Sequence, residues 1–578
     1  MKRRTGVLVL LLWFLLVLPV TAQDVAVQEY SLENGMTLLM VPRRGDPNIA
    51  AGWIAKVGSI YERPGITGVA HLFEHMMFKG THTIGTRDIN EDLQIIRELD
   101  AVKEQLREEQ QKLLDLYRLG QIDNPDDPAT RSIKHTELLD KFDELLTRQS
   151  ELVISTEIDR IYTSEGASAL NASTSYDWTR YQINIPANKL ELWFWLESDR
   201  LANPVFREFY SERDVVHEER RRSTDSTPTG KFEEQFNAMF WESSPYSWPI
   251  VGWPSDLDGI TREEAMTFFE VYYAPNNLSA ALVGDFVPSE AIALAKKYFG
   301  RLERGKKPPL RPRTREMPQV AEKRMIAHAE TTPQVVIRYH SVPDGHVDEP
   351  ALVVLAQILS GRTGRLYRSL VEEKQIANTA SAAQVGFGFE GFFEVRGTAK
   401  TGKTPEVVEQ AFYRELEKIQ TEPVSERELQ KVKNQNSARD FRSLRSNFGL
   451  MLQLLVREAR RGWETINSDP LLYETVTPLD VISVANKYLR SENRAVGIYY
   501  RKEILPEGTS SLAGLSEDEQ QQVQRLQKMI VQMDAAQLRQ SIIQFEQMSE
   551  QLPSGSQDMA KAVLRILRRR ASELGVDR

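Results

Sequence analysis

Residues 58–81 read GSIYERPGITGVAHLFEHMMFKGT, the most informative stretch of the 578 residues. A glycine-rich turn ends at Gly68, and residues 71–78 carry apolar side chains at the spacing of one helix face. His71 and His75 are four residues apart, which is about one helical turn, so both imidazoles project from the same face. The stretch therefore predicts a turn followed by a helix whose two histidines point in one direction.

This predicted helix has the side chains that a zinc site needs. Two neutral imidazoles can bind one Zn²⁺ at about 2.0–2.1 Å each. Glu74 precedes His75, and a carboxylate there can take a proton from a water whose pKa the metal lowers to about 7. The order His-x-x-Glu-His marks the inverzincin class. We expect His71 and His75 as metal ligands and Glu74 as the catalytic base; the alternative is a helix whose histidines only form hydrogen bonds.

A catalytic zinc also needs a third protein ligand and an open fourth position. The chain has no cysteine, so this ligand must be His, Asp or Glu. Residues 211–220 read SERDVVHEER, in which Glu212 and Glu219 are seven residues apart and share one helix face. We expect Glu219 to bind the metal and Glu212 to hold a ligand histidine. On spacing alone, Glu218 is an equally good third ligand.

The first 22 residues have the layout of a secretory signal peptide. A positive start at residues 2–4 precedes an apolar run at residues 6–18, and small residues lead to Gln23. The run is short for a bilayer span, which needs about 20 residues. We therefore expect export to the periplasm or the outside, with no stable membrane span after cleavage. The net charge of -9 argues against nucleic acid as a partner.

The remaining pattern predicts an α+β protein with two homologous halves. We expect a catalytic half at residues 23–308, interrupted at about 88–160 by a helical hairpin in which apolar residues recur at helical spacing. Residues 309–505 repeat the order of elements, and residues 506–578 predict a helical tail. The second half has no histidine pair, and Lys433 stands where the first half has Glu219, so we expect one Zn²⁺ per chain.

Three stretches of the chain resemble the pitrilysin/insulinase family, which includes mitochondrial processing peptidase. They are residues 58–81, 171–181 and 212–222, with a weaker likeness over 359–376. The resemblance implies two homologous α/β domains, each a mixed sheet flanked by helices, that form half of a clamshell around an unfolded peptide.

The resemblance also implies roles for particular residues. It assigns the third ligand to Glu219, seven residues after Glu212. It places Asn171 and Ala172 on an edge strand that pairs with the backbone of a peptide substrate. Active relatives often carry an Arg and a Tyr seven residues apart in the second domain, and no matching Tyr follows Arg442 here.

The expected function is that of a zinc-dependent endopeptidase for short or unfolded peptides. Because two half-clamshells close around the substrate in this family, we expect a homodimer or a heterodimer with a related subunit. The alternative is a non-catalytic scaffold or binding subunit of a heterodimeric peptidase. Such subunits usually have damaged metal motifs, whereas this chain keeps every expected metal-site residue.

Overall fold

The computed structural model describes residues 24–306, 309–501, 516–530, 533, 535–549 and 557–573. The predicted signal peptide lies outside these residues. One compact unit reaches residue 500, apart from residues 328–331, which group with residues 501 onward in a second unit. Over the described ranges, no helix has the length and apolarity that crossing a bilayer requires.

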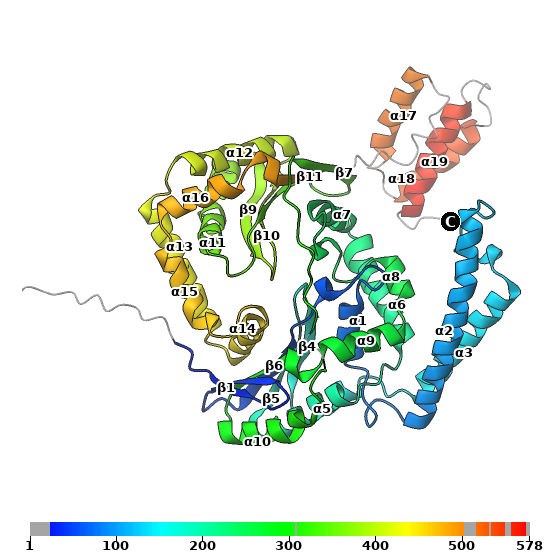
Figure 1. Ribbon diagram of the computed structural model, residues 1–578. Helices are drawn as coiled ribbons and strands as arrows, with labels where there is room; N and C mark the ends of the chain where they lie inside the picture. Colours follow the sequence, from blue (N-terminus) through cyan, green and yellow to red (C-terminus); the bar gives the residue numbers. More distant parts are fainter. Residues whose placement is uncertain are drawn as a thin grey trace, which may run out of the picture. The chain divides into compact units, whose positions relative to one another are not determined.

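A six-stranded mixed sheet forms the centre of the first half (Figure 1). β2 and β6 pair in parallel and the other neighbours are antiparallel. β1 and β2 form a hairpin, and Gly35 supplies the positive φ of 92° that its turn needs. β4 lies at one edge, so its outer backbone is unpaired within the described sheet. In spatial order the strands are β1 (Gln28–Ser31), β2 (Thr37–Pro42), β6 (Leu278–Gly284), β3 (Asn48–Ala55), β5 (Thr179–Pro186) and β4 (Ser168–Thr174).

Helices from the first half pack against one face of this sheet. The motif helix α1 buries Leu72, Phe73 and Met76 in this core, as its apolar spacing predicts. The helices are α1 (Val69–Met76), α4 (Glu157–Ser164), α5 (Leu190–Ala202), α6 (Phe209–Arg220), α8 (Pro254–Gly259), α9 (Arg262–Tyr272) and α10 (Pro288–Tyr298).

Two long helices, α2 (Ile89–Arg118) and α3 (Ile133–Leu152), lie side by side where the sequence predicts a helical hairpin (Figure 1). The base of this hairpin is anchored by Asp92 and Arg207, which form a fully buried ion pair of 2.8 Å. The guanidinium of Arg207 also donates to the backbone carbonyls of Lys79 and Ile84. The hairpin is therefore attached to the loop that follows α1.

The second half contains a five-stranded sheet with its own helices, which confirms the predicted α+β class with two sheet-containing halves (Figure 1). Ser425 caps α13 in a capping box with Glu428. In spatial order the strands are β7 (Lys323–Ala329), β11 (Arg494–Arg501), β8 (Gln334–Ser341), β10 (Gly391–Ala399) and β9 (Ala377–Gly386). The helices of this half that flank its sheet are α11 (Glu349–Leu359), α12 (Pro405–Thr421), α13 (Glu426–Ser443), α15 (Thr465–Thr475) and α16 (Pro478–Tyr488).

The two halves exchange one helix each. α14 (Asn447–Arg460) belongs to the second half in sequence but packs on β3 and β6 of the first sheet, where Leu454 and Leu455 are fully buried. In return, α7 (Gly230–Phe240) of the first half reaches the second sheet, where the Phe240 ring stacks on His340 at 4.0 Å. This exchange explains why both halves form one compact unit.

The second unit contains the helices predicted for the tail. They are α17 (Glu517–Ile530), α18 (Ala535–Ser549) and α19 (Gln557–Glu573). Val523, Leu538 and Val563 are buried in a small core of their own. Ser516 donates its backbone N–H to the Glu519 carboxylate at 2.8 Å, which is one of the two bonds of a capping box.

We expect Leu454→Ala to destabilise the first unit strongly. This leucine is 0% exposed beneath α14, and truncation of a buried leucine costs about 2–5 kcal/mol. Urea unfolding followed by circular dichroism measures the change. Leu479→Ala is the matched control, because Leu479 is 74% exposed. Equal midpoints for the two variants would contradict the packing described for α14.

Candidate metal centre

The start of α1 fixes the direction in which its polar side chains point. Gly68 adopts a φ of 92°, and the backbone N–H groups of Gly68 and Ala70 donate to the Glu62 carboxylate at 2.9 and 2.8 Å. Burial raises the pKa of this carboxyl well above its usual range. With Leu72 and Phe73 in the core, the opposite side of α1 presents the two histidines and Glu74.

The structure brings His71, His75 and Glu219 together. Their ligand atoms all lie within 4.8 Å of one another. Glu219 Oε2 is 3.6 Å from His71 Nε2 and 3.5 Å from His75 Nε2, whereas hydrogen bonds are normally about 2.7–3.2 Å long. Two ligands held tetrahedrally by zinc are about 3.4 Å apart when each bond is about 2.1 Å. The donor set therefore fits a zinc ion.

The two histidines differ in protonation, and His71 is in the neutral form that metal binding requires. Burial and the neighbouring His75 lower the pKa of His71 to about 4, so His71 is neutral. Burial alone would lower the pKa of His75, but the hydrogen bond and charge of Glu212 outweigh it and raise that pKa. His75 Nδ1 lies 2.9 Å from Glu212 Oε1. Because an ionised carboxylate only accepts, this bond assigns the proton to Nδ1 and leaves Nε2 to face Glu219.

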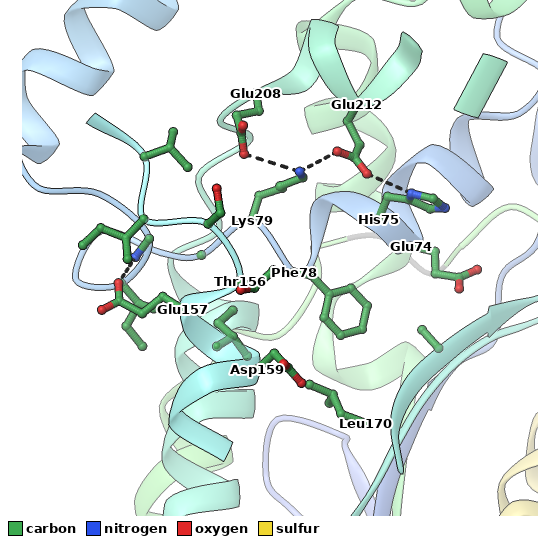
Figure 2. A pocket seen from close by; sticks show the side chains of 18 of the residues that line it. Glu74, His75, Phe78, Lys79, Thr156, Glu157, Asp159, Leu170, Glu208 and Glu212 are labelled. Atoms are coloured by element: carbon green, nitrogen blue, oxygen red, sulfur yellow. Dashed lines mark hydrogen bonds and ion pairs between the residues drawn. The ribbon is translucent and has the colours of Figure 1, made fainter. Parts of the chain in front are cut away.

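A lysine that the sequence did not single out completes this bond network. Figure 2 shows Lys79 between Glu208 and Glu212, with its ammonium 2.5 Å from Glu212 Oε2 and 3.4 Å from Glu208 Oε2. Burial would raise the pKa of the Glu212 carboxyl, but the bonds from His75 and Lys79 outweigh burial and lower it. Helical spacing gave no signal for this contact, because α1 ends at Met76 and Lys79 lies in the loop beyond it.

Glu74 connects the helix to the edge strand. Thr174 Oγ1, on β4, donates to Glu74 Oε2 at 2.6 Å, a contact that sequence analysis did not identify. Burial raises the pKa of the Glu74 carboxyl, and the Thr174 bond partly opposes this shift. The carboxylate thus stands beside the histidines with one oxygen held and the other, Oε1, available.

A cavity of about 440 Å³ opens beside Glu74 and His75 (Figure 2). Asn171 and Ala172 line it from β4, and residues 153–159 form another part of its wall. The edge of the sheet and the metal-ligand group therefore share one accessible space.

The described residues contain no second group of three potential ligands with this spacing. In the second half, the face of α13 that corresponds to Glu219 carries Lys433, whose ammonium donates to the Glu474 carbonyl at 2.7 Å. Among the described residues, His71, His75 and Glu219 are therefore the single candidate metal centre of this kind.

Two α/β halves, with an inverse His-x-x-Glu-His helix facing a second helix that supplies a carboxylate, define the inverzincin class. Residues 43–101 match the family model described as "Insulinase (Peptidase family M16)", and residues 259–436 match "Peptidase M16 inactive domain". Over these two stretches the chain is similar to the insulinase family of peptidases, family M16.

Known relatives share most of the chain. A protein of Helicobacter pylori named "Zinc protease PqqE" is 25% identical over 473 residues, which cover 80% of this chain and 90% of the relative. A solved protease structure from Helicobacter pylori has a TM-score of 0.67 and 22% identity, and covers 82% of this chain and 99% of that one. The periplasmic protease PqqL of Escherichia coli matches with a TM-score of 0.60 and 18% identity, covering 83% of this chain and 48% of PqqL. At these identities the solved structures support the fold.

We expect Glu212→Gln to weaken zinc binding about 10- to 100-fold, because partners that orient ligand histidines typically contribute that much to metal affinity. Competition with a chromophoric chelator measures the change. Glu218→Gln is a matched control, since the Glu218 carboxylate binds Arg221 and Arg222 instead. Loss of affinity in the Glu218 variant, with none in the Glu212 variant, would contradict the described geometry.

Proposed function

We propose that this protein is a zinc-dependent endopeptidase that hydrolyses short or unfolded peptides. The observation that carries the proposal is the convergence of His71, His75 and Glu219 beside the Glu74 carboxylate. The match to the insulinase family model and the relatives named zinc proteases support it. In this proposal the three converging side chains hold the ion, and Glu212 fixes the orientation of His75.

When bound, zinc supplies Lewis-acid chemistry, which activates water near neutral pH and polarises a carbonyl oxygen. Glu74 takes the proton from the attacking water as the new C–O bond forms. It then gives this proton to the amine nitrogen as the C–N bond breaks, so it acts first as base and then as acid. Because Thr174 holds Oε2, Oε1 of Glu74 is the atom that carries the proton.

The edge strand supports the choice of an extended peptide as the substrate. β4 has no partner on its outer side among the described strands, and Asn171 and Ala172 on this strand line the cavity beside Glu74. A peptide that adds to β4 gains backbone hydrogen bonds without a demand for one particular side-chain sequence. A folded segment cannot pair in this way, so the substrate is short or unfolded.

We further propose that the protein is exported and works as a dimer with a second copy or a related subunit. The layout of the first 22 residues supports export. The missing Tyr after Arg442 supports a partner that completes the substrate chamber. For the domains we propose residues 23–308 as catalytic, 309–505 as the homologous half and 506–578 as the tail.

A second candidate function is that of a non-catalytic scaffold subunit. The match of residues 259–436 to a domain described as inactive is the observation in its favour. That match lies outside the motif helix and covers neither Glu219 nor the two histidines. The complete donor set favours the peptidase.

We expect Glu74→Gln to retain zinc but to lose peptide cleavage by at least about 100-fold, the lower range for a positioned acid–base group. Zinc content by mass spectrometry and cleavage of a quenched fluorescent peptide provide the two measurements. Glu218→Gln serves as the isosteric control and should retain its rate. Undiminished cleavage in the Glu74 variant would remove Glu74 from the mechanism, and no cleavage by the wild type would favour the scaffold subunit.

A further inference from the structure

A second cavity, of about 410 Å³, lies where α14 meets the first sheet and the loop before α11. Its wall includes Arg180 of β5, Gln453 and Arg460 of α14, and Glu349 at the start of α11. Both halves of the chain contribute to this wall. In sequence, α11 and α14 belong to the second half and β5 belongs to the first half. The metal-centre residues are absent from this wall.

Three donor atoms at this cavity lack a hydrogen-bond partner. Arg180 Nε, Gln453 Nε2 and Arg460 Nε are each buried, and each has no acceptor among the described residues. A buried donor without an acceptor costs about 1–3 kcal/mol, so these three residues favour an acceptor in the cavity beside them, either water or a ligand group. The Arg180 guanidinium lies over the Trp178 ring at 5.1 Å and forms no ion pair with a described residue.

The balance of charge at this cavity favours an anion. Four arginines face three carboxyl groups along the wall. Arg457 and Arg461 share Asp469, at 2.5 and 2.6 Å. Burial, together with the charge of Asp344, raises the pKa of the Glu349 carboxyl to about 7, so this group is only partly ionised near neutral pH. Arg460 pairs with Asp344 at 3.2 Å, which leaves Arg180 as the arginine of this wall without an ion pair among the described residues.

Strand register relates this cavity to the peptide path. Arg180 pairs with Ser173 of β4, and the neighbouring pair is Thr179 with Thr174. Since successive side chains of a strand point to opposite faces, Arg180 lies on the face opposite to Thr174 and Glu74. A peptide strand added to β4 would present alternate side chains to these two faces. One set would enter the cavity beside Glu74, and the other would face Arg180.

We propose that Arg180, Gln453 and Arg460 form a subsite for a carboxylate of the bound peptide. This carboxylate has two possible sources in the peptide. One is an acidic residue adjacent in sequence to a residue whose side chain enters the cavity beside Glu74. The other is the C-terminus of the peptide. This inference rests on the proposed function for the identity of the ligand. It adds a charge preference to a backbone-paired substrate that would otherwise be bound without regard to sequence.

Binding to a cleavage-deficient variant tests this proposal without the need for turnover. Four labelled peptides share one neutral sequence. Three of them are acetylated and amidated at their ends and carry Glu, Gln or Lys at alternate positions. The fourth carries Gln at these positions but has a free C-terminal carboxylate. Fluorescence anisotropy on zinc-loaded Glu74→Gln protein measures each Kd. We expect a carboxylate peptide to bind about 10-fold more tightly than the Lys peptide, as for one charge-assisted hydrogen bond. Whether the internal Glu or the free C-terminus gains affinity identifies the source.

Arg180→Gln in the same background should reduce this affinity ratio to near one, and Arg180→Lys should retain part of it. Gln453→Met, which removes a second donor, should lower the ratio in the same direction. Arg97→Gln is the control for charge, because Arg97 is exposed on α2. Equal affinity for all four peptides, or an unchanged ratio in Arg180→Gln, would overturn the subsite. If the wild type discriminates in binding but cleaves no peptide, the proposed peptidase function fails and the subsite stands.

Discussion

The hydrogen bond between Glu212 and His75 is the interaction on which the site depends. It joins α1 to α6 and fixes the proton on His75 Nδ1, so that Nε2 faces Glu219. Glu219 is about half exposed and lies two turns beyond Glu212 on the same helix face, so little else holds it near the imidazoles. Lys79 strengthens this connection through the second oxygen of Glu212. Affinity for a metal and the orientation of the third ligand therefore follow from one contact between two helices.

The exchange of helices links stability to recognition. α14 closes the core of the first sheet with Leu454 and Leu455, while Gln453 on the same helix faces the arginine-lined cavity. The helical hairpin has a comparable double role. The Asp92–Arg207 pair at its base supports the loop after α1, and residues 153–159 at its end form part of the wall beside Glu74. α14 and the helical hairpin, which lie outside the first sheet, thus determine both the position of the site and its surroundings.

Local patterns predicted the parts of the fold that depend on neighbouring residues. The hairpin at Gly35, the motif helix and the cap at Ser425 all follow from signals within a few residues. The sequence did not predict that α14 crosses to the first sheet, because periodicity reports only on neighbouring residues. This packing joins residues about 400 positions apart, and the 2.8 Å ion pair of Lys56 with Glu458 is an example. α6 also starts at Phe209, two residues before the stretch 211–220 on which its prediction rested, because Glu208 adopts a φ of 55° before the helix. At the site, residue spacing alone did not distinguish Glu218 from Glu219 as the third ligand. The three-dimensional arrangement shows that the Glu219 carboxylate faces the histidines.

The central claim is that one divalent ion is held by two imidazoles from α1 and one carboxylate from α6. Anomalous diffraction at the zinc edge, from crystals of the zinc-loaded protein, tests this claim most directly. The account predicts a single peak at about 2.0–2.2 Å from His71 Nε2, His75 Nε2 and a Glu219 oxygen. A peak bound elsewhere, or one at the histidines with Glu219 turned away, would contradict it.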